Sequence, residues 1–444
     1  NHYQFHWNQK LNQSWSSNVG LNYTYGLGYF EQYRKDDLVD FYGGLILSDI
    51  DENGNETGTS DLIRRRWLDN DFFVLNASAN YFSNRMNMTF GTFYSNYSGD
   101  HFGEIVWARK FGKNTSIRDR YYEGNGKKTD FSFFAKTSYT FNKSVEFYGD
   151  LQFRKVDYKT TGLTSDLVNM IIDNSYSFFN PKFGISYKIN PNVMFYGSYS
   201  RANREPSRSD YESNLDVKPE ELNDFELGWR YRKIGLKFNL NVYYMLYNEQ
   251  LVLSGALDDV GTPIRTNSGS SYRLGIETDA KVNLSDYFII NSSMTISSNK
   301  NKQILSPMDG DIFDFGKTNI SFSPEFMTSN AIIFKPKDNL KLSVLSKYVG
   351  MQYMGNTDAL NSKLESYFVN DFNIFYEINP NNIFKSIVFS VLVNNLFDVE
   401  YISNGYYYTY EDTWSNSGQV KTLDGAGYYP QATRNFLIGL TLKF

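Results

Sequence analysis

The chain has 444 residues, no cysteine, three histidines and a net charge of −5 at pH 7. Without cysteine, disulfides and cysteine-bound metals are excluded, and the scattered His2, His6 and His101 argue against a histidine-based metal or catalytic site. Charges of both signs are interspersed, which argues against nucleic-acid binding.

Aromatic residues make up 18% of the chain, with 36 Tyr and 36 Phe. Membrane β-barrels place such rings in girdles at both lipid–water interfaces. Mean hydropathy is −0.49 and no run of about 18 apolar residues occurs, so no transmembrane helix is expected. A barrel hides its apolar surface by alternation, so a polar average is compatible with a membrane protein.

Period-two alternation is the dominant pattern and predicts β-strands. In 236–247 the even positions are apolar, and in the last strand Phe436, Ile438, Leu440, Leu442 and Phe444 share one face. Most expected strands exceed the ~9–11 residues that cross a bilayer. In chain order, seventeen strands are expected at 2–10, 15–31, 63–81, 86–98, 128–142, 144–158, 178–190, 192–202, 222–233, 235–249, 270–284, 287–299, 317–335, 339–354, 366–379, 385–397 and 432–444.

The connections between these strands alternate between short and long. Short turns rich in Asn, Asp, Pro and Ser, such as 142–143 and 190–192, alternate with long segments, such as 99–127 and 398–431. This asymmetry is typical of all-β, antiparallel transmembrane barrels, and a soluble β-sandwich has no reason to maintain it. The last strand then ends at the periplasmic side. An odd strand count predicts that further strands precede residue 1.

Several segments resemble TonB-dependent outer-membrane receptors, most closely those of Bacteroidetes. These are the closing strand 429–444, the segment Val-Asn-Asn-Leu-Phe-Asp-Val-Glu-Tyr (393–401) and the mid-barrel segments 204–211 and 218–228. The resemblance implies a barrel of twenty-two strands with an N-terminal plug. Residues 1–444 are then expected to form a single, partial barrel domain that lacks the plug and about five strands.

The resemblance also implies the function of active uptake of a scarce nutrient across the outer membrane. An iron–siderophore complex, haem or cobalamin is favoured over a glycan. The implied partners are outer-membrane lipid, the small nutrient ligand, the barrel-assembly machinery, and the TonB complex through the N-terminal region. A passive porin and a surface adhesin are the alternatives.

Aromatic residues gather in the last long connection and are candidates for stacking on a ligand. They are Tyr406, Tyr407, Tyr408, Tyr410 and Trp414. The alternative is that these rings form an interface girdle or pack on their own loop. Tyr428 and Tyr429 favour that alternative, because they stand where the last strand enters the membrane.

Arginines near the outer end of a strand are a second set of candidates, because they could attract an anionic chelate. These are Arg201, Arg204 and Arg208. The alternative is that they pair with Glu205, Asp210 and Glu212, or with carboxylates of the plug.

Three further features complete the candidates. The terminal Phe444 is expected to act as a barrel-assembly signal, as the family implies. The segment beginning at Asp49 and Asp51 starts like a calcium loop, but Ser60 occupies its twelfth position, so no metal is expected. Acid pairs such as Asp258 and Asp259 have no companion histidine, so neither an enzyme nor a bound cofactor is expected.

Overall fold

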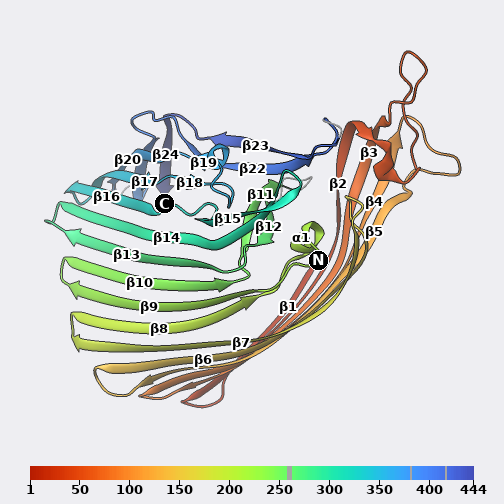
Figure 1. The fold of residues 1–444 in the computed structure, drawn as a ribbon. Helices are drawn as coiled ribbons and strands as arrows, with labels where there is room; N and C mark the ends of the chain where they lie inside the picture. The colour runs from red at the N-terminus through yellow and green to blue at the C-terminus, as the bar shows by residue number, and fades with distance from the viewer. Residues whose placement is uncertain (258–262, 381–382, 416–417) are drawn as a thin grey trace. The chain divides into compact units, whose positions relative to one another are not determined.

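The computed structural model describes residues 1–257, 263–380, 383–415 and 418–444. It consists almost entirely of antiparallel strands (Figure 1). The chain divides into two compact units. The first unit comprises Asn1–Tyr139, Tyr148–Pro181 and Glu205–Val217, and the second comprises Thr140–Phe147, Lys182–Arg204 and Lys218–Phe444.

The first unit is dominated by long strands. Its β1, β2, β3, β4 and β5 pair in that order, each antiparallel to the next. Its elements are β1 (His2–Lys10), β2 (Trp15–Leu38), the 3-10 helix η1 (Val39–Tyr42), β3 (Thr59–Phe82), β4 (Met86–Ala108), most of β5 (Arg120–Thr140) and β6 (Val145–Leu163), the first part of β7 (Asn169–Asn190), and helix α1 (Arg208–Ser213).

The second unit continues the antiparallel pairing from β7 through β8, β9, β10, β13, β14, β16, β17, β20 and β21 to β24. Its elements are β8 (Val193–Arg204), β9 (Glu220–Lys233), β10 (Leu236–Asn248), β11 (Leu251–Leu257), β12 (Pro263–Asn267), β13 (Ser271–Asn283), β14 (Phe288–Met308), β15 (Asp311–Asn319), β16 (Phe326–Lys337), β17 (Leu340–Val349), β18 (Gln352–Tyr353), the 3-10 helix η2 (Leu360–Ser362), β19 (Lys363–Leu364), β20 (Tyr367–Ile378), β21 (Ser386–Asn394), β22 (Ile402–Asp412), β23 (Lys421–Pro430) and β24 (Asn435–Lys443).

Among the described residues, eighteen strands belong to the large sheet. Strands β15 and β16 both pair with β14, one with its outer half and one with its inner half, so they share one position in the sheet. The sheet thus has the seventeen positions expected. The expectation of one continuous strand at 317–335 was wrong, because Phe322 has a positive φ of 50° and Pro324 has no N–H to donate.

Several strands extend further than expected. Strand β2 continues to Leu38 and β4 to Ala108, well into segments expected as connections, and β7 begins at Asn169. The segments 250–269 and 398–431 also contain hairpins, β11–β12 and β22–β23. Outside the membrane both faces of a strand meet water or protein, so the clean alternation that marks a lipid-facing strand is lost there.

The short turns are closed by their own polar side chains. The Asn142 carboxamide oxygen accepts the N–H groups of Ser144 and Val145, and Asn190 does the same for Asn192 and Val193. An Asx turn of this kind reverses the chain in two or three residues. The tight turns β9–β10 and β13–β14 lie at one end of the second unit's sheet (Figure 1).

The two faces of the second unit's sheet differ in chemistry along whole rows of paired residues. One row, made of register partners in eight strands, is entirely apolar, and the neighbouring row on the other face carries charges. The apolar row is Leu236, Val282, Ile290, Ile332, Val344, Phe372, Val393 and Phe436, and the other row is Lys237, Lys281, Asn291, Ala331, Leu345 and Asp371. One face is therefore suited to lipid and the other to water.

Candidate functional site

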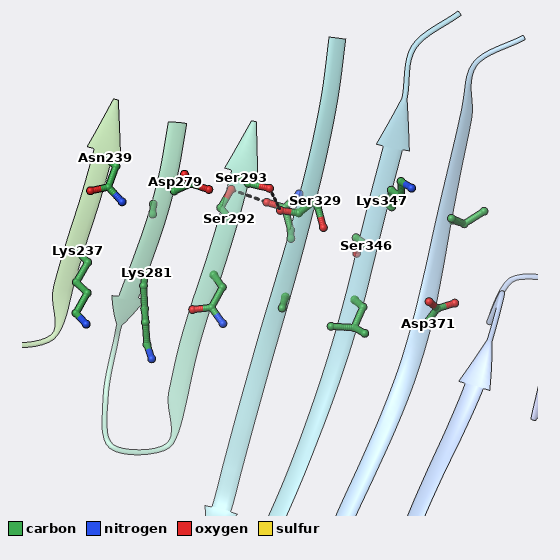
Figure 2. A pocket seen from close by; sticks show the side chains of 16 residues that line it. Lys237, Asn239, Asp279, Lys281, Ser292, Ser293, Ser329, Ser346, Lys347 and Asp371 are labelled. Atoms are coloured by element: carbon green, nitrogen blue, oxygen red, sulfur yellow. Dashed lines mark hydrogen bonds between the residues drawn. The ribbon is translucent and has the colours of Figure 1, made fainter. Parts of the chain in front are cut away.

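An open cavity of about 550 Å³ lies on the polar face of the second unit's sheet, and Figure 2 shows the side chains that line it. Lys237 of β10, Lys281 of β13 and Asp371 of β20 line it, together with serine and asparagine side chains from the strands between them. Charges of both signs and neutral donors are thus spread over one wall. Such a wall holds water and offers hydrogen bonds to a polar solute.

Arg201 and Arg204 lie at the outer end of β8, where each pairs with a carboxylate of β9. Arg201 Nη2 is 2.5 Å from Glu221 Oε2, and Arg204 Nη2 is 3.4 Å from Glu220 Oε2. Glu220 Oε2 also accepts the Leu251 N–H at 2.7 Å, so it holds β11 beside this pair. These partners differ from Glu205 and Asp210, which the sequence suggested. An anionic ligand would therefore have to compete with Glu220 and Glu221.

Glu205 instead lies buried in an ion cluster of the first unit. Its carboxylate is 2.5 Å from Lys128 Nζ and 2.7 Å from Arg154 Nη1, while Arg154 also pairs with Asp130 at 2.6 Å. Burial alone would raise the pKa of Glu205, but the two cations hold it below its usual range. Lys128 and Arg154 were not among the functional residues expected from the sequence. The position of Arg154 within the expected strand 144–158 could have indicated a buried ion pair, because a charged side chain in a strand needs a partner.

This cluster anchors the segment 205–217, which carries α1. Arg208 pairs with Glu212 at 2.9 Å, as the sequence suggested, and donates to Thr160 at 3.0 Å. Tyr211 is fully buried and stacks on Tyr158 with ring centroids 5.5 Å apart. Arg208 therefore links α1 to β6, and its guanidinium is already bonded to both Glu212 and Thr160.

His101 belongs to the same region of the first unit. It lies fifteen residues along β4 from Met86, beyond the ~11 residues that cross a bilayer. Burial, and to a lesser extent the positive charge of Arg208, lowers the pKa of His101 to about 4. The imidazole is therefore neutral at physiological pH and contributes no charge to ligand attraction.

The aromatic candidates of the last long connection lie on the hairpin β22–β23, and the structure separates them by face. Tyr407 is only 6% exposed and packs with Met354 and Leu364. Its hydroxyl reaches Asp424 at 3.4 Å. Tyr407 thus holds the hairpin against the rest of the second unit. This agrees with the alternative that rings of this connection serve in packing and not in ligand binding.

Tyr406, Tyr408, Tyr410 and Trp414 form a continuous row on the hairpin, here called the aromatic strip. Successive ring centroids are 6.3, 6.4 and 6.0 Å apart, and the ring planes differ by 19°, 18° and 7°. Tyr408 and Tyr410 are about two-fifths exposed and Trp414 is 72% exposed. Four of the five candidate aromatics are therefore brought together, and Tyr407 lies apart from them.

The remaining candidates lie apart from these features. Phe444 is exposed, and its ring centroid is 5.0 Å from that of Phe384, so its role in barrel assembly stays a prediction. The Asp51 carboxylate accepts the N–H groups of Asn53 and Asn55, which makes it the centre of a turn. Asp258 and Asp259 lie outside the described residues.

Within the described ranges, no cluster of three or more His, Cys, Asp or Glu side chains is arranged to hold a metal ion. The helices of the same ranges are all too short or too polar to span a membrane.

Comparison with known proteins identifies the family. A family model described as TonB dependent receptor-like, beta-barrel, matches residues 1–396. The chain belongs to this family. Members of the TonB-dependent receptor family are transporters of the Gram-negative outer membrane and not enzymes, which confirms the expected outer-membrane location. The narrower resemblance to Bacteroidetes receptors stays a prediction.

Solved structures of such receptors share the fold at low sequence identity. The ferric citrate transporter FecA in its unliganded form superposes with a TM-score of 0.67 at 14% identity, covering 100% of this chain and 61% of FecA. The siderophore receptor PiuA from Acinetobacter baumannii gives 0.66 at 13% identity, covering 99% and 63%. The ferric-catecholate import receptor Fiu from E. coli K12 gives 0.61 at 14%, covering 98% and 63%. The chain thus spans less than two thirds of the length of these receptors.

The ion cluster generates a first prediction. Glu205→Ala leaves Lys128 and Arg154 facing a single carboxylate, and breaking a buried ion pair from one side costs about 3–5 kcal/mol. The segment 205–217 should then detach, and trypsin should cleave after Arg208 many times faster than in the wild-type protein.

The matched control is Glu123→Gln, which removes an exposed pair with Arg120 in the same unit. Exposed pairs contribute about 0–1 kcal/mol, so cleavage after Arg208 should not change. Equal cleavage of the wild-type and Glu205→Ala proteins would show that the ion cluster does not anchor this segment.

The buried tyrosine generates a second prediction. Tyr407→Ala removes a buried ring at a cost of about 3–5 kcal/mol, so the amides of β22 and β23 should exchange with deuterium much faster. Tyr410→Ala removes an exposed ring from the same strand and should leave exchange nearly unchanged. Similar exchange rates in both variants would contradict the assignment of Tyr407 as the residue that holds the hairpin.

Proposed function

We propose that this chain is the barrel of an outer-membrane receptor that imports a scarce nutrient as a small complex, with a ferric chelate as the favoured cargo. Membership of the TonB-dependent receptor family supports import. The similar structures described above are of proteins named for ferric citrate, a siderophore and a ferric catecholate. The cargo is carried over to this chain from those proteins as part of the proposal.

The polar wall is the observation on this chain that supports a transport path. Lys237, Lys281 and Asp371 of the cavity in Figure 2 belong to strands whose opposite face is apolar. A water-holding wall backed by a lipid-facing surface is what a membrane conduit needs. Residues 1–444 act as one barrel domain in this proposal.

The proposed cycle has three steps. The segments outside the membrane receive the complex. Polar groups along the inner wall then hold it, and Arg201 and Arg204 offer positive charge to an anionic chelate where it displaces Glu221 or Glu220. The TonB complex supplies the energy that opens the path, since the polar wall by itself provides no driving force.

Uptake of radioactive iron tests this function. Cells that depend on this receptor for iron should accumulate ferric chelates when TonB is present and fail to do so when TonB is deleted. Arg201→Gln combined with Arg204→Gln should weaken capture of an anionic chelate about a hundredfold or more, because each of the two lost charge-assisted contacts contributes about 1.5–3 kcal/mol.

Arg120→Gln is the matched control for these arginines, since Arg120 sits in an exposed pair of the first unit. Uptake that continues without TonB would favour a passive porin. Failure to take up ferric chelates, haem, cobalamin or oligosaccharides would favour a surface adhesin and would contradict the proposal.

A further inference from the structure

Among the described residues, one face of the hairpin β22–β23 packs on the protein, and the other face is largely exposed. On the fixed face, Gly310 donates its N–H to Glu411 Oε1 at 2.9 Å. Asp309 and Thr422 exchange two hydrogen bonds of 2.7 and 2.8 Å. Tyr428 donates its hydroxyl to the Asn361 carbonyl at 2.9 Å. These contacts and the buried Tyr407 hold the hairpin firmly, so the aromatic strip on its other face is presented in a defined shape.

Two glycines of β23 contact the rings of the aromatic strip. Tyr408 is paired with Gly425 and Tyr406 with Gly427. A Cβ at Gly425 would meet the Tyr408 ring at 2.6 Å, and a Cβ at Gly427 would overlap the Tyr406 ring. The rings therefore lie across the backbone of β23, and only glycine leaves the space for them. This arrangement of an aromatic side chain over a cross-strand glycine stabilises the hairpin and orders the rings.

The aromatic strip is long, and among the described residues of β22 and β23 its face carries just two charged side chains, Asp412 and Lys421. Its four rings are separated by about 6 Å at each step and are nearly parallel. Asp412 lies within this stretch, but its carboxylate accepts the N–H groups of Trp414 and Ser415 at 3.1 and 3.0 Å. Lys421, the register partner of Asp412, stands at the far end. A ligand must therefore bind through repeated flat contacts more than through charge.

We propose that the aromatic strip binds an extended, neutral oligosaccharide, one sugar ring on each aromatic ring. A pyranose has an apolar C–H face that packs on an aromatic ring, and a linear chain repeats that face at intervals close to the spacing of the rings. A compact metal chelate would cover one or two of the four rings, and an anionic chelate would find little positive charge there. The site is independent of the cargo carried by the barrel.

Binding to the receptor purified in detergent tests this proposal. Cellohexaose, maltohexaose and chitohexaose are titrated by calorimetry, each beside its disaccharide. At least one hexasaccharide should bind with a dissociation constant below about 1 mM, and its disaccharide should bind more weakly because it covers fewer rings. Tyr408→Ala should weaken hexasaccharide binding about tenfold, the loss of roughly 1.4 kcal/mol of ring contact.

Two further variants separate loss of the aromatic strip from damage to the hairpin. Gly425→Val keeps every aromatic residue but displaces the Tyr408 ring from β23, and it should weaken binding as Tyr408→Ala does. Thr409→Ala changes an exposed residue on the opposite face of the same strand and should bind like the wild-type protein.

Three outcomes would overturn the proposal. They are no binding of any hexasaccharide at about 1 mM, equal binding by the Tyr408→Ala and wild-type proteins, or binding of a proline-rich decapeptide at the strip in place of the hexasaccharides. Because the assay measures binding to purified receptor, its result is separate from that of the iron-uptake experiment.

Discussion

The hydrogen-bonding requirement of the backbone in lipid is the constraint on which the rest of this structure depends. The hydrocarbon layer contains no water, so every N–H and C=O within it must find a partner in the protein. Antiparallel pairing on both sides of a strand meets this requirement for the ladder strands from β8 to β21. A strand, however, must send neighbouring side chains to opposite faces. Leu345 lines the cavity, so its neighbour Val344 faces lipid. The other strands of this ladder likewise have one face toward lipid and one toward the cavity.

This division explains how much of the fold was predictable. The segment 235–249 alternates strictly, and β10 occupies Leu236–Asn248. Where lipid no longer imposes alternation, prediction from the sequence failed, as in the outer ends of β2 and β4 and in the hairpin β22–β23. The break between β15 and β16 depends on Pro324 and on a positive φ at Phe322, neither of which disturbs the apolar pattern enough to be noticed.

The candidate residues were less predictable, because their environment depends on contacts distant in sequence. Glu205 lies 77 residues from Lys128 and 51 from Arg154, so its proximity to Arg204 in sequence was a poor guide to its partners. Tyr406, Tyr407 and Tyr408 were grouped by proximity, yet strand geometry separates the middle ring from the other two. If the strand at 402–412 had been recognised in the sequence, the opposite orientation of Tyr407 could have been predicted. The fixed face of the hairpin could not be foreseen, because it depends on Asp309 and Asn361.

The regions that carry candidate function are those released from the lipid constraint. Beyond the membrane, one face of the hairpin β22–β23 packs on the protein while the other face displays the aromatic strip. The segment with α1 is likewise held by buried charges that lipid-facing positions do not tolerate. The same alternation of side chains along a strand therefore builds the barrel wall within lipid and presents the candidate binding residues in water.

Accessibility of adjacent positions in β17 tests the central claim most directly. The chain has no cysteine, so Val344→Cys and Leu345→Cys each give a single site for a nitroxide spin label. In lipid bilayers, the label at position 344 should collide mainly with oxygen, which concentrates in the hydrocarbon layer, and the label at position 345 with a water-soluble nickel chelate. Equal accessibility of the two positions to both reagents would contradict a sheet with one face in lipid and the other in water.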